Sequence, residues 1–199
     1  MALNFANNNS LSAITTKPSG LSGSSMNLIS TQTASSSSTI SFTSGIDDTY
    51  DEYVFKFIDI SNGSNATFQF NVSIDGGSNY NVAKTTTRFR AEINEDNASD
   101  NGLSYLTGED LAQGTGGQVI ASVRSDADSC CVGTLHLFNP SSTTFVKHFI
   151  SRLHSSNGSY CEDHYNAGYA NTTSAINAIK FFMSAGSIDS GVIKLYGIS

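Results

Sequence analysis

Residues 67–74 read TFQFNVSI, and the alternation in this stretch decides the fold class. Polar residues separate apolar side chains that occupy every second position, at Phe68, Phe70, Val72 and Ile74. Successive side chains of a β-strand point to opposite faces. A period of two therefore predicts a strand with one buried face and one face in contact with water.

Strand patterns continue on both sides of this stretch. Residues 38–42 (STISF) repeat the alternation, and residues 53–60 (YVFKFIDI) are apolar on both faces, which favours a central strand. Further segments rich in β-branched and aromatic residues lie at 82–93, 118–123, 131–138, 144–153, 178–185 and 191–198. About nine strands, joined by turns of Gly, Asn and Ser, predict an all-β fold. The domain expected over residues 39–199 is an antiparallel β-sandwich, jelly-roll-like.

Two connecting segments carry local signals of their own. Asp75 is followed by two glycines, and this combination predicts a hairpin turn, because Asp bonds its own backbone and Gly adopts positive φ. Residues 172–178 (TTSAINA) are the one segment where a helical turn is expected, capped by Thr173 or Ser174.

The first 38 residues differ from the rest of the chain. They are rich in Ser and Asn and sustain no helix or strand period, apart from a short strand candidate at 26–30 (MNLIS). Such a segment alone buries too little apolar surface to offset its ordering entropy. We expect residues 1–38 to form an extended docking arm, the alternative being a frayed tail. Its apolar anchors are Leu3, Phe5, Leu11, Ile14, Leu21 and Met26.

Composition and charge exclude several classes of protein. Charged residues make up 14% of the chain, against roughly 25% in an average soluble domain. With 10 Lys and Arg against 17 Asp and Glu, the net charge of −7 does not suit a phosphate backbone, so no nucleic-acid partner is expected. No apolar run approaches the roughly 20 residues that span a bilayer. The start lacks a secretory signal, so we expect no membrane insertion and a mature chain that begins at Met1.

Standard catalytic signatures are missing from the sequence. It contains no G-x-S-x-G, no G-x-x-x-x-G-K-[ST] and no H-E-x-x-H. The acidic residues Asp47, Asp48, Asp51 and Glu52 are interpreted as a solvated strand entry in which Asp47 forms a turn. Hydrolysis by paired carboxylates and a calcium site are the alternatives there. We expect neither catalytic residues nor a cofactor.

The cysteines and histidines gather between residues 130 and 164. Three cysteines, Cys130, Cys131 and Cys161, are an odd number with two adjacent members, which indicates free thiols in a protein made in a reducing compartment. Cys161 and His164 have a C-x-x-H spacing that a metal uses, but no second close pair completes a ligand set. Histidines on polar faces or interfaces are therefore the favoured interpretation, and no metal is expected.

The aromatic residues divide into two groups. Most of the 12 Phe occupy inward strand positions and are expected in the core. Five tyrosines are expected in or beside loops rich in Asn, Asp and Ser: Tyr80, Tyr105, Tyr160, Tyr165 and Tyr169. Tyrosine rings in such surroundings stack on sugars or serve protein contacts. These five are candidates for glycan or partner contact, with ordinary loop packing as the alternative.

Four segments together resemble one group of proteins. They are residues 41–57, 73–81, 133–151 and 171–199. The positions that carry the likeness are Asp47, Tyr50, Asp51, Tyr53, Asp75, Gly76, Gly77, Asn139, Pro140, Ser141, Gly186, Ile188, Gly191, Ile193, Leu195, Tyr196 and Gly197. The pattern resembles the C-terminal β-sandwich of tail fibres and related appendages of tailed phages of marine bacteria. The resemblance covers residues 39–199 and implies a virion building block. The group is poor in cysteine, and this chain departs from it there.

These features lead to one main hypothesis. We expect a structural component of a tailed-phage virion, a tail-fibre or appendage β-sandwich held by its N-terminal arm. Its expected partners are other virion proteins, further copies of itself in a homotrimer, and host surface glycans. The first alternative is a capsid decoration (cement) protein that stabilises the head. A glycan-degrading enzyme and a free carbohydrate-binding module of non-viral source are further alternatives. Both virion roles imply assembly in the bacterial cytoplasm.

Overall fold

The structure is a computed structural model that describes residues 26–97 and 101–199. Within these residues it contains twelve strands and one short 3₁₀ helix, η1 (Thr107–Glu109). The strands are β1 (Met26–Thr33), β2 (Ile40–Phe42), β3 (Glu52–Ser61), β4 (Ala66–Ser73), β5 (Lys84–Asn94), β6 (Gly102–Tyr105), β7 (Gln118–Val123), β8 (Cys131–Phe138), β9 (Lys147–Asn157), β10 (Tyr160–Ala170), β11 (Ala178–Met183) and β12 (Ser190–Ile198).

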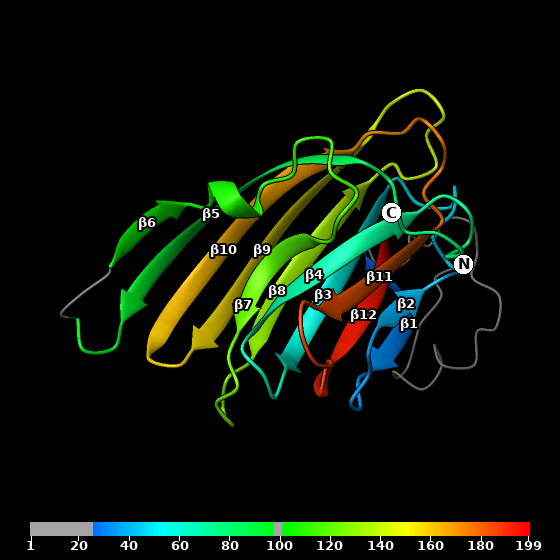
Figure 1. Ribbon diagram of the computed structural model, residues 1–199. Helices are drawn as coiled ribbons and strands as arrows, with labels where there is room; N and C mark the ends of the chain where they lie inside the picture. The colour runs from blue at the N-terminus through cyan, green and yellow to red at the C-terminus, as the bar shows by residue number, and fades with distance from the viewer. Residues whose placement is uncertain (1–25, 98–100) are drawn as a thin grey trace, which may run out of the picture.

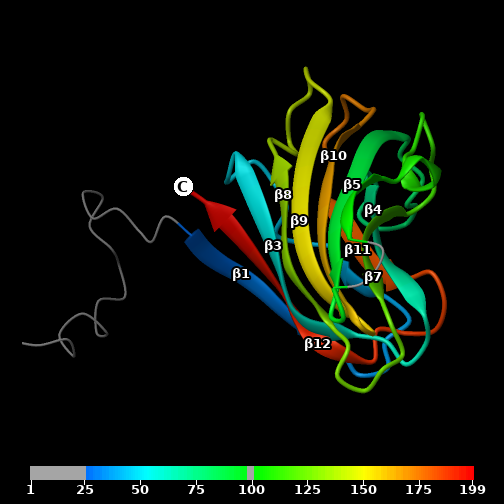
Figure 2. The ribbon, with the colours of Figure 1, turned by 90° about the vertical axis from the view of Figure 1, so that its left-hand side faces the viewer.

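Two antiparallel sheets face each other. The larger sheet has the strand order β1-β12-β3-β8-β9-β10-β5-β6, and the smaller has the order β2-β11-β4-β7. The smaller sheet lies in front of the larger one in Figure 1, and the larger sheet curves around it in Figure 2. The predicted all-β sandwich is confirmed. Because the larger sheet has twice as many strands, part of its inner face extends beyond the smaller sheet.

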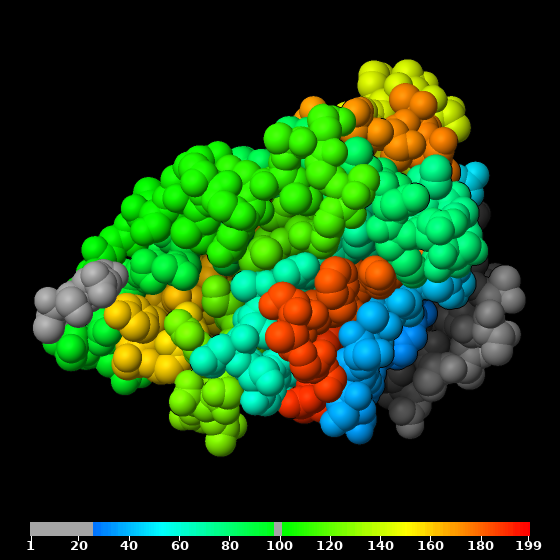
Figure 3. Space-filling model, viewed as in Figure 1, coloured from blue at the N-terminus to red at the C-terminus, as the bar shows by residue number. Residues whose placement is uncertain are grey.

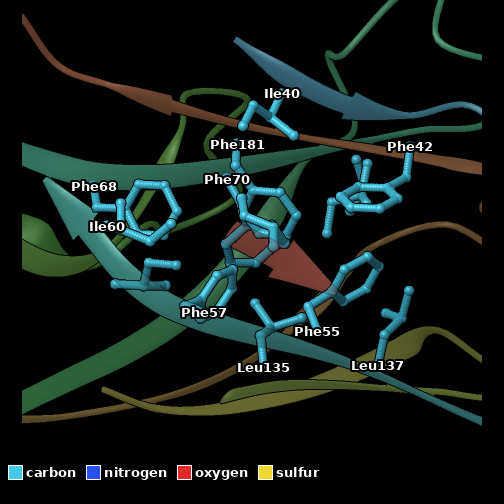
Figure 4. Packing of buried hydrophobic residues seen from close by; sticks show 14 of the residues in the cluster. Ile40, Phe42, Phe55, Phe57, Ile60, Phe68, Phe70, Leu135, Leu137 and Phe181 are labelled. Atoms are coloured by element: carbon cyan, nitrogen blue, oxygen red, sulfur yellow. The ribbon is translucent and has the colours of Figure 1, made fainter. Parts of the chain in front are cut away.

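A phenylalanine cluster joins the two sheets between β3, β4 and β11 (Figure 4). The ring of Phe181 in β11 is fully buried, and its centroid lies 5.3 Å from that of Phe55 and 5.1 Å from that of Phe57. Phe68 of β4 stacks on the same ring at 5.9 Å. The inward face predicted from the alternation is therefore correct within β4, but the face predicted to contact water is partly buried, since Asn71 and Ser73 are also buried. The predicted inward position is wrong for Ile74, which lies beyond the end of the strand and is exposed.

Over β5, β9 and β10 many of the buried side chains are polar or charged rather than apolar. Even-numbered residues of β10 point inward, and Glu162, His164 and Asn166 are all buried. Neighbouring β5 buries Lys84 and Arg88 in the same way. β10 is not among the strands predicted from the sequence, because its inward positions are polar and it has no apolar period. Its place in the sheet comes instead from pairing with β5 and β9 along its whole length.

The described N-terminal residues belong to the sandwich. β1 pairs with β12 at the edge of the larger sheet, with Met26 opposite Ile198 and Thr33 opposite Val192. The sandwich thus begins upstream of residue 38, where the arm was expected to end. Met26 opens an edge strand rather than anchoring an arm, because the free edge of β12 supplies its backbone partners. The other predicted anchors lie outside the described residues: Leu3, Phe5, Leu11, Ile14 and Leu21.

The turn after β4 is confirmed, but it is not a hairpin. Gly76 and Gly77 adopt φ values of +71° and +90°. Asp75 accepts a hydrogen bond from the backbone N–H of Asn79 at 2.8 Å, as an Asp-centred turn requires. β4 and β5, however, lie in different sheets, so the turn passes the chain from the smaller sheet to the larger one.

The helical turn expected at residues 172–178 is absent. There the backbone N–H of Ser174 bonds the Thr172 hydroxyl, and that of Ile176 bonds the carbonyl of Pro140. The contact with Pro140, which is distant in the sequence, takes the N–H that a helical turn would bond locally. In the part of the chain that the structure describes, no helix has the length and apolarity needed to cross a membrane.

Candidate binding groove

The inner face of the larger sheet stays open beyond β7, the edge strand of the smaller sheet. β7 packs over β9 and β10, and the neighbouring ends of β5 and β6 surround a hollow of about 450 Å³. Its lining residues are Arg90, Glu92, Asn101, Gly102, Leu103, Ser104, Arg124, Asn157, Tyr160 and Glu162. In Figure 3 the gold residues near the start of β10 remain visible beside the green ones of β5 and β6. We call this hollow the polar groove.

A second hollow of about 280 Å³ adjoins the polar groove. The two share Arg90, Arg124 and Asn157 in their walls, so the groove continues toward β4 and β7. Its additional polar lining comes from Asn65, Thr67, Ser122 and Ser184. Hydroxyl and amide groups at the surface of a hollow form hydrogen bonds with a polar ligand, and their spread over both hollows suits a ligand of more than one unit.

Arg90 forms the centre of an ion-pair network in the groove. Its Nη2 lies 2.6 Å from Glu92 Oε2, and its Nη1 lies 3.0 Å from Glu162 Oε1. Burial raises the pKa of Glu162. Hydrogen bonds from His164 and Asn157, with the charge of Arg90, outweigh that effect and leave the pKa below its ordinary value. Glu162 is therefore ionised at neutral pH and fixed in place by its partners.

A hydrogen-bonded chain leads from Glu162 to Arg124. Asn157 Nδ2 donates to Glu162 Oε1 at 2.7 Å. The Oδ1 atom of the same amide accepts from Arg124 Nε. This chain determines which way the Asn157 amide faces, because only its oxygen accepts and only its nitrogen donates. Arg124 is consequently held at Nε, and the residue lines both hollows.

His164 lies behind the groove with a defined tautomer. Arg88 Nη2 is 2.8 Å from His164 Nδ1. A guanidinium only donates, so Nδ1 accepts and the proton of the neutral ring is on Nε2. Burial lowers the pKa of His164, and the charge of Arg88 adds to this against the raising effect of Glu162. The ring is therefore neutral at pH 7.

Ser155, His164 and Glu162 have the residue types of a hydrolytic triad but not its geometry. Ser155 Oγ lies 2.9 Å from His164 Nε2, and Glu162 Oε2 lies 3.3 Å from the same nitrogen. A triad requires the serine on one ring nitrogen and the acid on the other. Here Arg88 occupies the second nitrogen, and Ser155 is fully buried. The three side chains form a structural network and do not activate the serine.

Arg88 connects the sheet to the loop that carries η1. It is fully buried, pairs with Glu109 of η1, and burial lowers its pKa to about 10. Its backbone N–H donates to Asp110 Oδ1 at 2.8 Å, and Tyr105 Oη donates to Asp110 Oδ2 at 2.5 Å. The loop is thereby held against β5 and β6 next to the groove.

The five candidate tyrosines do not gather in one place. Tyr160 lines the polar groove from the start of β10. Tyr80 lies elsewhere, on the smaller sheet, where Lys180 Nζ sits 4.7 Å from its ring centroid. The remaining three, Tyr105, Tyr165 and Tyr169, are strand residues on the opposite, outer face of the larger sheet, rather than loop residues.

Two of these tyrosines form an aromatic row on that outer face. Tyr105 lies opposite Phe89, and Phe89 lies opposite Tyr165, on the adjacent strands β6, β5 and β10. The rings of Phe89 and Tyr165 are stacked at 4.7 Å and 6°. We call Tyr105, Phe89 and Tyr165 the outer aromatic row. Tyr169 is further along β10, next to His148 with 6.1 Å between ring centroids.

The histidines and cysteines form no metal site. Cys161 is exposed and His164 is buried, because a spacing of three places them on opposite faces of β10. Among residues 26–97 and 101–199, no three His, Cys, Asp or Glu side chains are close enough to bind a metal ion. The predicted free thiols are confirmed. The expectation for the histidines is wrong for His164, which is a core residue.

The acidic strand entry is a structural turn, as expected. Asp47 Oδ1 accepts from the backbone N–H of Thr49 at 2.9 Å, and the hydroxyl of buried Tyr53 lies 3.0 Å from the same atom. Hydrogen bonds from Thr49 lower the pKa of Asp47. Glu52 contacts His136 Nδ1 at 2.5 Å on the outer face. Asp47 and Glu52 thus bond different partners and share none.

The residues of the polar groove are absent from the sequence-based candidates, with the exception of Tyr160. Arg90, Arg124 and Glu162 lie on three separate segments, β5, the residue after β7, and β10, and only the sheet brings them together. The available signal is the alternation of charged and apolar residues at positions 88–93 of β5 (RFRAEI). That pattern marks a strand but does not say which face is buried.

Comparison with protein-family models, with curated proteins and with solved structures finds no significant match to this chain.

Proposed function

We propose that this chain is a structural component of a tailed-phage virion, a tail-fibre or appendage β-sandwich that assembles with copies of itself. In this proposal the polar groove contacts glycans of the host surface. The resemblance over residues 39–199 supports the virion role. The observation that carries the proposed assembly is the exposed apolar outer face of the larger sheet. Proteins that act alone rarely expose large contiguous apolar patches.

The apolar outer face extends around the outer aromatic row. Leu103 is 72% exposed, Ile150 is 54% exposed and Ile93 is 48% exposed. Strand register places Leu103 and Ile93 beside the row on β6 and β5, and Ile150 on β9, the strand next to β10. Hollows of about 320 and 350 Å³ on this face are lined by side chains of β5, β9 and β10. A partner burying these residues gains hydrophobic stabilisation.

The charges on this face fit a second copy of the same chain. Arg152 Nη2 lies 2.7 Å from Asp163 Oδ2 beside the aromatic row, and Arg152 also lies 5.1 Å from the Tyr165 ring centroid. The centre of the face is therefore neutral, although the whole chain carries −7. Copies that meet there bury apolar surface without like-charge repulsion. We propose a homotrimer built on this face.

Sedimentation velocity tests the assembly. We expect the wild-type chain to sediment as a trimer and the double variant Leu103→Glu, Ile150→Glu to sediment as a folded monomer. Ile74→Glu is the matched control, since Ile74 is also exposed but lies after β4, away from this face. A monomeric wild type, or a trimer that survives the double substitution, contradicts assembly through the outer face.

Labelling of virus particles tests the virion role. Antibodies against the recombinant chain should bind purified particles of the phage whose genome encodes it. Label at fibres or other tail appendages supports the proposal. Label on the head supports the alternative role of a capsid decoration protein. A chain that is absent from purified particles contradicts both.

The tether is proposed for the residues before Met26. Residues 26–33 pair with β12, so the deletion that tests the tether removes residues 1–25 and leaves the sheet intact. We expect this shortened chain to fold but not to enter particles. Normal incorporation would refute the tether while leaving the outer-face assembly unaffected.

A further inference from the structure

One arginine of the groove forms no ion pair with any residue that the structure describes. The chain has four arginines, and Arg88, Arg90 and Arg152 each lie within ion-pair distance of a carboxylate. Arg124 has no carboxylate partner among the residues that the structure describes. Its bonded neighbour is the neutral amide of Asn157. An arginine in a hollow without an anionic partner is a ready binding group for an external anion.

The guanidinium of Arg124 is oriented before any ligand arrives. Asn157 holds its Nε, and Asn157 is buried and itself bonded to Glu162. Glu162 in turn is fixed by Arg90. Because this chain of contacts holds the inner edge of the guanidinium, binding orders fewer side chains and costs less conformational entropy. Among the described residues no hydrogen bond engages the terminal nitrogens, so they can donate two parallel N–H groups to a ligand.

The geometry of a guanidinium selects a planar carboxylate. Two parallel N–H donors match the two oxygens of one carboxylate and form a bidentate pair. A single charge suits the site, because Glu92 and Glu162 in the same groove disfavour a more highly charged anion. The anion expected beside Arg124 is thus a carboxylate.

The rest of the groove suits the hydroxyls of a sugar. Glu92 Oε2 is engaged by Arg90, and the carboxylate lines the groove as an acceptor for ligand hydroxyls. Ser104 lies opposite Arg90 on β6 and offers a hydroxyl group. The adjoining hollow adds Thr67 and Ser122. Neutral and anionic hydrogen-bonding groups around one cation form a surface for a polyhydroxylated ligand that bears a carboxylate.

We propose that the polar groove binds acidic glycans, with Arg124 holding the carboxylate of a sugar acid such as a uronic or nonulosonic acid. This inference rests on the glycan contact of the proposed function and specifies its ligand class. The adjoining hollow receives the next sugar unit, which Thr67 and Ser122 contact through their hydroxyls.

A glycan array with matched acidic and neutral members provides the test. The array carries uronic-acid oligosaccharides, glycans ending in N-acetylneuraminic acid, and the methyl esters of both, which differ only in the lost charge. We expect retention of an acidic member and at least about tenfold weaker binding of its methyl ester, since a charge-assisted bidentate contact is lost. Titration calorimetry then measures the affinity of each variant for the retained glycan.

Arg124→Gln should weaken binding of the acidic glycan at least about tenfold and leave the methyl ester unchanged. Arg124→Lys keeps the charge but not the two-pronged contact, so its affinity for the acidic glycan should lie between those of the wild type and Arg124→Gln. Lys180→Gln is the control, because it removes one positive charge from the smaller sheet, where Lys180 lies over the Tyr80 ring, and it should bind as the wild type does. Circular dichroism confirms that each variant is folded.

Three outcomes overturn the inference. If acidic members are not retained, or if esters bind equally well, the groove does not recognise a carboxylate. If Arg124→Gln binds as the wild type does, the acidic sugar is held elsewhere. Retention of neutral glycans alone would refute this inference but support the glycan contact of the proposed function. Retention of no glycan would refute both, while particle labelling would still decide the virion role.

Discussion

The two halves of the sandwich interior are held by different interactions. Between β3, β4 and β11, stacked and edge-to-face phenylalanine rings surround Phe181. Between β5, β9 and β10, buried ionic and polar side chains are linked in a network around Glu162 and His164. The first half excludes water by close packing, which is non-directional. The second half depends on hydrogen-bond and ion-pair partners at defined positions. Removal of one partner leaves a buried polar group unpaired.

This difference explains why the groove lies where it does. Buried ion pairs add little net stability, because desolvation of the charges offsets their attraction. They do, however, hold side chains in one orientation, as Asn157 holds Arg124. Lys84 marks the border of the two halves: its buried Nζ donates to Asn71 Oδ1 of β4 at 2.6 Å, and burial lowers its pKa to about 8. The phenylalanine half stabilises the fold, and the polar half positions the groove.

The largest effect is expected from a cavity in the phenylalanine half. Phe181→Ala should lower the free energy of unfolding by about 3–5 kcal/mol, because several rings lose their common partner. Urea denaturation measures this change in the free energy of unfolding. Phe145→Ala is the control, since Phe145 is 68% exposed and its removal should leave stability nearly unchanged. Equal effects of the two substitutions would show that the cluster is not the main source of stability.

A smaller loss is expected from the polar half. Glu162→Gln removes the charge that accepts bonds from Arg90, Asn157 and His164, and should lower the free energy of unfolding by about 1.5–3 kcal/mol. The same urea titration compares it with Phe181→Ala. A loss larger than that of Phe181→Ala would reverse the proposed division between the two halves. Glu52→Gln, a partly exposed carboxylate on the outer face, should have the smaller effect of the two acidic substitutions.

The polar half should also make stability depend on pH. The lowered pKa of His164 means that the unfolded chain takes up a proton near pH 6.5 while the folded chain does not. Stability should therefore fall as pH decreases from 7 toward 5, by at most about 1.4 kcal/mol per pH unit from this residue. Glu162 contributes only at lower pH, since its stabilisation is lost as pH falls below 4.5.

Urea midpoints at several pH values test this dependence. His164→Gln should reduce the loss between pH 7 and 5. His148→Gln changes an exposed histidine on the outer face and should leave the wild-type dependence in place. A variant at His164 with an undiminished pH dependence would show that another group titrates.

The smallest effect is expected at the exposed ion pair. Arg152 and Asp163 make the same kind of contact as Arg90 and Glu162, but the Arg152 side chain is 65% exposed. In the monomeric double variant Leu103→Glu, Ile150→Glu, the added substitution Arg152→Gln should leave the urea midpoint unchanged within error, because water solvates both charges in either state. A clear loss of stability in this monomer would show that the ion pair is shielded from water within a single chain.

Strands of the phenylalanine half are predicted from the sequence more completely than those of the polar half. The strands β4, β7, β8, β11 and β12 were all expected, since apolar periods and Gly-rich turns delimit them. β10 was missed, because a strand whose inward residues are Glu162, His164 and Asn166 has no apolar period. β1 was partly missed, since an edge strand depends on its neighbour. Of the groove, only Tyr160 was a candidate.

The sequence by itself determined the all-β class, most strand positions and the phenylalanine core. Hydrophobic periodicity is a local property, and burial of apolar surface follows from it. Only the tertiary structure decided that Arg90, Arg124 and Glu162 meet, because they lie on segments whose pairing is set by sheet order and register. It also decided that the Asp75 turn connects two sheets and that Tyr165 faces outward. Polar groups are satisfied by partners distant in sequence, and local patterns carry no information about those partners.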